Sequence, residues 1–242
     1  MTLDELVPKL FPAGHDIARG PHGTISGKAQ IAEGQPVAVL GVIEQTPVGI
    51  DNAILLSTQV LDLIGKGEKI PLIMLVDSSS QNMARRDEML GLNEYLSHLY
   101  KCLFLAVKQG HLTVGILYGK AAAGAFIATC LSMQVLVAVD GAEPSVMDLT
   151  SIASVTKLPL DKLEEMAKST PVFAPGIDHL AVTGAITETW DESKPLADRL
   201  TDLLRTKPGL PDRRDQIGVE RKGRLMAASV AERIAQEAQA NG

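Results

Sequence analysis

The chain has 242 residues, enough for one large domain with a full core or for two small ones. Apolar residues make up 45% of it and aromatic residues only 3%, so the core must be built from aliphatic side chains. The formal net charge of −6 excludes general nucleic-acid binding, which needs a basic face that displaces counterions from phosphate. No run of about 18 apolar residues predicts a membrane span, and the acidic start MTLDELVPKLFPAG is not typical of a signal peptide. We therefore expect a cytoplasmic protein with no nucleic-acid or membrane partner.

The N-terminal third predicts a helix, a hairpin and a second helix. Residues 3–14 read as a short amphipathic helix that ends at Pro12 and Gly14, and residues 15–27 read as a Gly/Pro-rich loop. Residues 28–45 alternate in short β-like pieces that break at 33–36, which is typical of a hairpin. Residues 52–69 have helical periodicity, and Asp51 is the expected N-cap.

The middle of the chain alternates between strands and helices. IPLIMLVD (70–77), LTVGILY (112–118) and QVLVAVD (134–140) are continuous apolar runs of strand length, the pattern of strands buried on both faces. A long helix is expected over 86–109 and another in the Ala-rich segment after Gly119. This order predicts βαβ units, a mostly parallel sheet and an α/β fold.

From about residue 148 the pattern becomes helical. Short helices separated by Pro159, Pro171 and Pro175 lead to a small strand at 185–190, and helices over 197–205 and 212–240 close the chain. No repeat, low-complexity tract or linker is present, so residues 1–242 are predicted to form one domain. Its core spans about 35–190, and 191–242 is a helical extension.

The segment GKAAAGA (119–125) is the tightest predicted strand-to-helix turn. A P-loop requires Gly-x-x-x-x-Gly-Lys followed by Ser or Thr, and here Lys120 precedes Ala121. A nucleophile elbow requires Ser at the centre of Gly-x-Ser-x-Gly, and Ala stands there. A dinucleotide fingerprint requires three glycines in Gly-x-Gly-x-x-Gly order, which the segment lacks. The turn therefore offers backbone groups rather than side-chain chemistry.

Two interpretations of this backbone remain open. Small side chains let a ligand approach exposed N–H groups at a helix start, as in an oxyanion hole that holds a developing enolate or alkoxide. Alternatively, the alanines only allow the helix to pack closely on the sheet. Composition does not separate the two.

Other polar and reactive residues give weaker signals. The DSSSQ at 77–81 follows a buried strand, where α/β folds place ligands, but it also suits an N-cap cluster. ARRDE at 84–88 is typical of a solvated helix start, and Cys102 and Cys130 read as buried thiols in a reducing compartment. Residues 205–242 hold eight Lys/Arg against five Asp/Glu, which fits either a solvated face or contact with an acidic partner. No metal is expected, because the histidines show no ligand spacing; they stand at 15, 22, 98, 111 and 179.

Taken together, residues 35–190 resemble the carboxyltransferase half-domain of acyl-CoA carboxylases, a branch of the crotonase superfamily. In that family a buried strand ends in Asp-Thr-Pro-Gly, and a Gly-Glu-Gly-Gly-Ser-Gly-Gly-Ala turn opens a helix. Here VDSS (76–79) stands for the first element, GKAAAGAF (119–126) for the second, and AEPSVMDLTSIAS (142–154) for a following Ser/Pro segment. The resemblance implies a crotonase-like α/β fold, with stacked ββα units, a mostly parallel sheet and C-terminal helices.

The departures from this pattern separate the chain from biotin-dependent transferases. Asp-Thr-Pro-Gly has become Asp-Ser-Ser-Ser, and the Gly-rich turn has become Ala-rich. The chain is similar to the gamma-subunit family of biotin-independent malonate decarboxylases. That resemblance implies a homologous beta subunit in a heterodimer or heterotetramer, with the active site at their interface. It further implies a malonyl group on an acyl carrier protein with a phosphoribosyl-dephospho-CoA arm, acetyl carrier and CO₂ as products, and neither biotin nor another cofactor bound to this chain.

The resemblance also implies roles for individual residues. One oxyanion donor is assigned to the N–H of Ala121 or Ala122, and the other to the N–H of Val48 or Gly49. The amides could hold either the enolate oxygen or the carboxylate, because the two halves of a paired site divide those tasks. Residues expected to line the substrate are Gly119, Lys120, Ala123, Gly124, Ser78 and Ser79. Those expected to contact a partner subunit, the acidic carrier protein or the phosphates of its arm are Arg221, Lys222 and Arg224.

Two other functions remain as alternatives. The chain could be a subunit of a biotin-dependent acyl-CoA carboxyltransferase, although the altered Gly-rich turn argues against it. It could also be a non-catalytic scaffold that stabilises the beta subunit.

Overall fold

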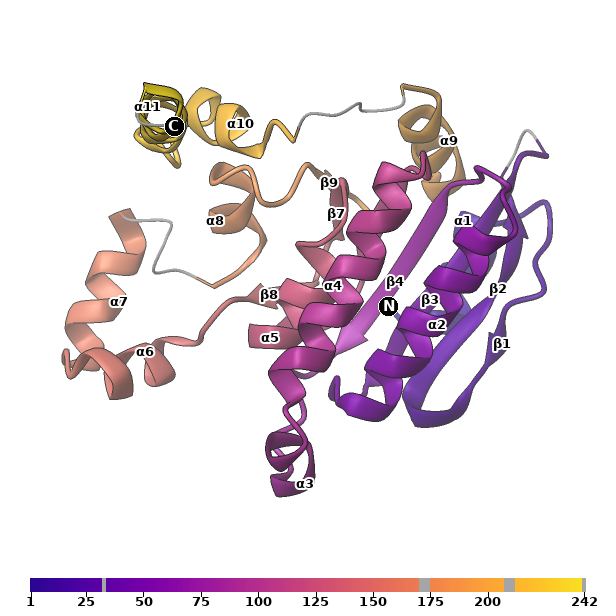
Figure 1. Ribbon diagram of the computed structural model, residues 1–242, viewed down its shortest axis with the longest axis horizontal. Helices are drawn as coiled ribbons and strands as arrows, with labels where there is room; N and C mark the ends of the chain where they lie inside the picture. The colour runs from indigo at the N-terminus through magenta and orange to yellow at the C-terminus, as the bar shows by residue number, and fades with distance from the viewer. Residues whose placement is uncertain (32–33, 170–174, 207–211, 241–242) are drawn as a thin grey trace.

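The computed structural model describes residues 1–31, 34–169, 175–206 and 212–240. Within these residues, a seven-stranded sheet in the order β1-β2-β3-β4-β5-β7-β9 organises the fold, and β6 and β8 form a separate two-stranded sheet (Figure 1). The strands are β1 (Ala18–Arg19), β2 (Thr24–Gln30), β3 (Pro36–Gln45), β4 (Leu72–Ser78), β5 (Thr113–Leu117), β6 (Lys120–Ala122), β7 (Val135–Val139), β8 (Glu143–Ser145) and β9 (Glu188–Trp190). The helices are α1 (Leu3–Leu10), the 3₁₀ turn η1 (Pro21–Gly23), α2 (Ile50–Gly65), α3 (Arg85–Met89), α4 (Leu92–Lys108), α5 (Ala123–Ala125), the π-helix η2 (Phe126–Cys130), α6 (Leu149–Thr156), α7 (Leu160–Ser169), α8 (Ile177–Val182), α9 (Leu196–Thr206), α10 (Arg214–Glu220) and α11 (Ala227–Ala240).

The sheet has an antiparallel edge and a parallel centre. The hairpin predicted over 28–45 is confirmed, since β2 pairs antiparallel with β3 from Thr24 opposite Val42 to Gln30 opposite Pro36. From β3 onward each neighbour is parallel, through β4, β5, β7 and β9, which confirms the mostly parallel α/β class. The loop predicted over 15–27 is wrong in part, because β1 and most of β2 lie within it and pair with each other.

Two hydrophobic cores cover the two faces of this sheet. One lies between the sheet and α2, α4 and η2, and it includes Met74 and Val76 of β4. The other lies between the sheet and α1 and α9, and it includes Ile73 and Leu75 of the same strand. Both faces of β4 are therefore buried, which is why its sequence is a continuous apolar run rather than an alternating one.

Three predicted helices differ from the observed ones. Helix α2 begins at Ile50 with Gly49 as its N-cap, so the predicted cap Asp51 is wrong. The helix expected over 86–109 is divided into α3 and α4 by Gly91, whose φ of +83° interrupts helical geometry. The segment 212–240 is likewise divided into α10 and α11, because Lys222 has a φ of +62°, which interrupts helical geometry.

The later elements follow the predicted order. Helices α6, α7 and α8 and the small strand β9 lie within the segments expected for them, and α9 matches the helix expected over 197–205. Glu33 and Pro171, which the sequence marks as breaks, lie outside the described residues. No helix in the described part of the chain is both long and apolar enough to cross a membrane. In Figure 1, α11 lies away from the sheet, while α5 lies near the arrowhead of β4 and α3 lies below it.

Candidate functional site

Three loops meet at the carboxyl ends of the parallel strands β3, β4 and β5. The backbone of Val48 pairs with the loop after β4, since its N–H donates to Ser80 O at 2.8 Å and its carbonyl accepts from Asn82 N–H at 2.8 Å. The loop after β4 in turn holds the turn after β5, because Asp77 Oδ1 accepts from Lys120 N–H at 2.9 Å. Sequence segments that lie about 30 to 75 residues apart thus form one edge, where parallel sheets bind ligands.

The alanine-rich turn starts as a strand rather than a helix. Residues 120–122 form β6, which pairs in parallel with β8 so that Ala121 lies opposite Pro144. Proline has no N–H, and Glu143 N–H donates to Gly119 O at 2.9 Å, so the ladder directs both polar groups of Ala121 toward β8. The N–H of the next residue, Ala122, points the opposite way and takes no part in the ladder. Of the two predicted donors, Ala122 is therefore the one that the fold leaves open.

Burial separates the same two alanines. The side chain of Ala121 is fully buried in the core under α4 and η2, whereas Ala122 is half-buried. Ala121 therefore allows close packing, which is one of the two interpretations that the sequence left open for the alanine-rich segment. Ala122 keeps part of its surface exposed.

The turn carries backbone strain. Ala123 has φ +50°, in a region that residues with a Cβ rarely adopt, and it is followed directly by Gly124. Glu44 and Gln45, at the end of β3, also have positive φ values of 58° and 52°. After three residues of α-helix the chain continues as the π-helix η2, a rare geometry found mainly at functional sites. Strained backbone therefore gathers at this one edge of the sheet.

The second predicted donor pair is already engaged, which corrects the sequence-based expectation. Val48 N–H is bound to Ser80 O, and Gly49 N–H donates to Asn52 Oδ1 at 2.8 Å. The physical reason is that Gly49 is the N-cap of α2, which starts at Ile50, while Val48 forms a parallel β-bridge with Gln81 in the loop after β4. Val48 and Gly49 position the loop but offer no free donor in this structure.

A buried carboxylate that sequence reasoning missed completes this cap. Asp87 is 2% exposed, and its Oδ2 accepts from Ile50 N–H at 3.1 Å and from Asn82 Nδ2 at 3.0 Å. Arg86 bridges Asp87 Oδ1 at 3.2 Å and Asp51 Oδ2 at 2.8 Å. The segment 84–88 was expected to be solvated, and for Asp87 that is wrong. No local pattern in ARRDE distinguishes the buried residue from its exposed neighbours.

The predicted substrate-lining residues lie at this edge in different environments. The Ser78 hydroxyl is fully buried without a hydrogen-bond partner among the described residues, on the face of β4 that carries Met74 and Val76. Ser79 is partly exposed, and its N–H donates to Gln45 O at 3.3 Å. The ammonium of Lys120 lies 3.4 Å from Glu143 at the surface. Gly119 packs against Asp77, where a Cβ would collide with the carboxylate.

Gln81 is a further residue that the sequence did not single out as a site residue. Its Oε1 accepts from Gly124 N–H at 2.9 Å, which links the loop after β4 to the start of α5. The signal that could have found it is its place four residues after Asp77, in the polar segment that follows a buried strand. A ligand at Ala122 would lie beside this side chain.

The three predicted carrier contacts lie far along the chain from this edge and have unlike roles. Arg221 donates to three carbonyl oxygens, Ala181 O, Ile186 O and Thr187 O, each at 2.8 Å. Its guanidinium therefore fastens α10 to the segment between α8 and β9, which corrects the expectation that it meets a carrier. Lys222 and Arg224 lie at the surface or near it, in the connection between α10 and α11.

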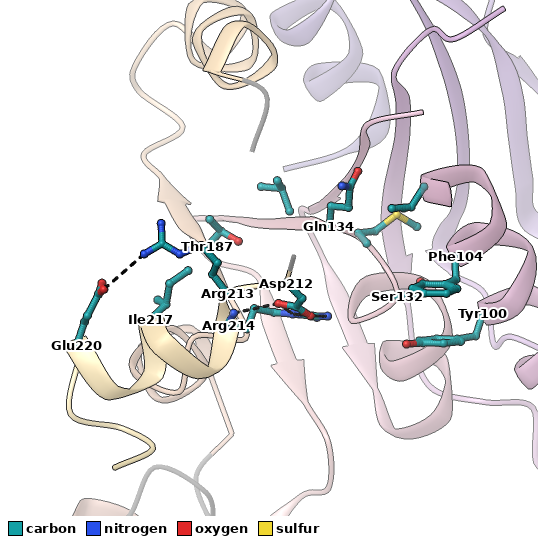
Figure 2. A pocket seen from close by; sticks show the side chains of 13 residues that line it. Tyr100, Phe104, Ser132, Gln134, Thr187, Asp212, Arg213, Arg214, Ile217 and Glu220 are labelled. Atoms are coloured by element: carbon teal, nitrogen blue, oxygen red, sulfur yellow. Dashed lines mark hydrogen bonds and ion pairs between the residues drawn. The ribbon is translucent and has the colours of Figure 1, made fainter. Parts of the chain in front are cut away.

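A separate cavity of about 340 Å³ lies at the opposite, amino-terminal ends of the strands. Figure 2 shows Tyr100 and Phe104 of α4 on one side of it, and Arg213 and Arg214, just before and at the start of α10, on the other. Arg213 reaches Glu220 at 3.9 Å, and Arg214 is bound to Asp212 and to Leu131 O. None of the predicted site residues lines this cavity. Its position therefore separates it from the strained edge.

The described residues contain no group of three or more His, Cys, Asp or Glu that could hold a metal ion. Burial raises the pKa of the Cys130 thiol to about 12, and burial also raises the pKa of Cys102. Both thiols are therefore neutral near pH 7 and poor nucleophiles. What the edge offers to a ligand is backbone and carboxamide hydrogen bonding.

Comparison with known proteins identifies the family of this chain. A family profile described as malonate decarboxylase gamma subunit matches residues 43–238, which includes all three loops of the edge. The chain belongs to the malonate decarboxylase gamma subunit family.

Individual relatives agree with this gamma-subunit assignment. The malonyl-S-ACP:biotin-protein carboxyltransferase MADD of Malonomonas rubra is 32% identical over 128 residues, which cover 52% of this chain and 44% of that protein. The chain thus matches less than half the length of this curated relative. Among solved structures, a Pseudomonas malonate decarboxylase hetero-tetramer in complex with coenzyme A has a TM-score of 0.83 at 24% identity, covering 96% of this chain and 98% of that one. The Pseudomonas malonate decarboxylase MdcD–MdcE hetero-dimer has a TM-score of 0.77 at 25% identity, covering 96% and 97%. These matches confirm the predicted crotonase-like class of this gamma-subunit chain.

Proposed function

We propose that this chain is the gamma subunit of a malonate decarboxylase and acts with a homologous beta subunit. Family membership supports the reaction, and the hetero-dimer and hetero-tetramer named for the similar Pseudomonas structures support the partner. The substrate is a malonyl thioester on an acyl carrier protein with a phosphoribosyl-dephospho-CoA arm, in keeping with the malonyl-S-ACP substrate named for the Malonomonas relative. The products are the acetyl thioester and CO₂. A reducing cytoplasm suits the two free thiols.

The reaction needs charge stabilisation more than side-chain nucleophiles. The bond between the malonyl methylene and its carboxylate carbon breaks, CO₂ leaves, and the electron pair moves into an enolate whose charge rests on the thioester oxygen. A proton then adds to the methylene carbon to give the acetyl thioester. The thioester carbonyl is itself the electron sink, so neither biotin nor a metal takes part. Fixed donors aimed at the developing charge lower this barrier.

The single observation that carries the proposal is the open N–H of Ala122 at a strained strand-to-helix turn. The β6–β8 ladder fixes this amide in place and turns it away from β8. The half-buried methyl group leaves room for a substrate oxygen to approach. We assign this N–H to an oxygen of the malonyl group.

The test uses the purified chain, the beta subunit and malonyl carrier protein. The chain alone is expected to be inactive and the reconstituted complex to release CO₂ without biotin. Ala122→Leu is expected to lower kcat/KM strongly while assembly is retained, because the added side chain hinders the approach to the amide. Ala13→Leu, which adds the same bulk at an exposed loop position, is the matched control.

The same variant separates the atoms that Ala122 could hold. A fall in kcat with little change in KM assigns the amide to the enolate oxygen, because that interaction forms only in the transition state. A rise in KM with kcat retained assigns it to the carboxylate of the bound substrate. Full turnover by an assembled Ala122→Leu complex contradicts the proposal and favours a scaffold role.

A second candidate function is carboxyl transfer to a biotin protein. The 32% identity with a malonyl-S-ACP:biotin-protein carboxyltransferase favours it. That enzyme class moves the carboxyl group to biotin rather than releasing it. If the complex releases no CO₂ on its own and instead transfers the malonyl carboxyl group to an added biotin protein, and avidin blocks that transfer, this second function replaces the first.

A further inference from the structure

An oxygen that gains a full charge is held best by more than one donor, and the other amides at this edge to which the sequence assigned this role are already engaged. Val48 N–H and Gly49 N–H are bound within the protein, to Ser80 O and Asn52 Oδ1. Ile50 N–H is bound to the Asp87 carboxylate. A second donor beside Ala122 is therefore none of these three amides, and a side chain at the same edge can supply it.

Gln81 is fixed at both its backbone and its side chain. Val48 and Gln81 form a parallel β-bridge, with Val48 N–H bound to Ser80 O and Asn82 N–H bound to Val48 O, each at 2.8 Å. The side-chain oxygen is bound to Gly124 N–H at 2.9 Å. Gly124 has no side chain, so Gln81 and Leu96 pack directly against it. These contacts hold the carboxamide against Gly124, which follows Ala122 by two residues in the chain.

The hydrogen bond from Gly124 also fixes which way the carboxamide faces. A backbone N–H only donates, so the atom beside it must be the carbonyl oxygen and not the amide nitrogen of Gln81. The NH₂ group therefore faces the other side. Among the described residues it contacts Met83 Sδ at 3.4 Å, and a thioether is a weak acceptor. Gln81 is partly exposed and Met83 largely exposed, so a ligand has access to this NH₂ group.

We propose that the Gln81 carboxamide supplies the second hydrogen-bond donor to the malonyl group, beside the Ala122 N–H. This inference rests on the proposed decarboxylase function and names the side chain that acts with the turn. A carboxamide does not titrate, so it stabilises developing negative charge on an oxygen without exchanging a proton. Gly124 holds it in advance, which avoids the cost of orienting it during the reaction.

Gln81→Glu is the decisive variant, tested in the reconstituted complex with malonyl carrier protein. Glutamate keeps the shape and the acceptor for Gly124 N–H, but it replaces the donor NH₂ with an oxygen. We expect kcat to fall by about 10²- to 10³-fold, the range found when one oxyanion donor is removed, with assembly and melting temperature unchanged. Gln109→Glu, an equal charge change at an exposed position after α4, is expected to retain wild-type kcat.

Gln81→Met separates donation from the structural link to Gly124. Methionine has a similar length but neither accepts well nor donates, so it removes both interactions. If Gln81→Glu is as active as wild type while Gln81→Met is impaired, the residue serves only as a link and the inference is overturned. If Gln81→Glu does not assemble, Gln81→Met decides: a kcat loss of about 10²-fold or more supports the inference, and any smaller loss overturns it. A wild-type complex that releases no CO₂ instead overturns the proposed function, which distinguishes the two failures.

Discussion

Replacement of Asp87 by alanine is expected to destabilise the chain by about 2–4 kcal/mol. The carboxylate is 2% exposed and accepts from Ile50 N–H, Asn82 Nδ2 and Arg86 Nη1. Arg86 is 57% exposed and keeps its bonds to Asp51, so its loss adds little. Through the other two hydrogen bonds Asp87 satisfies Ile50 N–H and the partly buried Asn82 Nδ2, and leaving a buried donor unsatisfied costs about 1–3 kcal/mol. A water that enters the vacated space brings the sum toward the lower end.

This loss corresponds to a fall in melting temperature of roughly 5–15 °C, since 1 kcal/mol shifts a chain of this size by about 2–4 °C. Thermal unfolding followed by circular dichroism measures it. Asp87→Asn keeps one oxygen for Ile50 N–H and is expected to lose less than half as much. Asp62→Ala, an exposed carboxylate on α2, is the control and is expected to stay within about 0.5 kcal/mol of wild type.

An Asp87→Ala protein that melts within about 2 °C of wild type would refute the reasoning. That result means that the loop before α2 finds other partners and that Asp87 does not fix it. Equal losses for Asp87→Ala and Asp87→Asn would instead show that the negative charge, rather than the acceptor oxygen, is what the cap requires.

Three further predictions follow from other contacts. Gly49→Ala is expected to lower the melting temperature, because the added Cβ would collide with the buried carboxylate of Asp87. Gly65→Ala, at the open C-terminal end of α2, is expected to raise the free energy of unfolding by about 0.5–1 kcal/mol. Equal effects of the two variants in thermal unfolding would contradict this reasoning. Arg221→Met is expected to cost about 1–3 kcal/mol of stability without changing the KM for carrier, because its guanidinium binds three carbonyl oxygens of the fold. Lys222→Glu is expected to leave stability unchanged and to raise that KM at low salt. The reverse pattern in thermal melting and steady-state assays would identify Arg221 as a carrier contact. Burial raises the pKa of Cys130 from an ordinary value near 9 to about 12. The folded state therefore keeps a proton that the unfolded state releases, and the free energy of unfolding falls as pH rises from 9 to 12. Chemical denaturation at increasing pH should show a shallower fall in this free energy for Cys130→Ala.

The strands were predictable because their signal is local. A strand buried on both faces must be apolar at every position, and β4, β5 and β7 each read as such a run without knowledge of their neighbours. The turn after β5 was also visible, since Gly and Ala at a strand-to-helix boundary leave only the backbone to act. The order of these elements carried the resemblance that the family profile confirms.

The helix boundaries and the donor assignment were less predictable because distant residues decide them. Helix α2 begins before Asp51 because Asp87, 37 residues away from Ile50, accepts the Ile50 N–H. The choice of Ala122 over Ala121 depends on β8, where Pro144 has no N–H and the ladder engages both polar groups of Ala121. Arg221 looks like a surface cation in the sequence, but three carbonyls that lie 34–40 residues away bind it.

The sequence by itself determined the α/β class, the order of the strands, and a turn whose chemistry rests on its backbone. These follow from side-chain size and polarity at adjacent positions, which the chain carries without tertiary context. Only the tertiary structure decided which amides remain open, because a hydrogen bond formed across the fold consumes a donor that the sequence leaves available. Hydrogen bonds within the fold engage the N–H groups of Val48 and Gly49, and the β6–β8 ladder leaves the Ala122 N–H outside its pairing. The Gln81 carboxamide is oriented by Gly124, which lies 43 residues away in the chain.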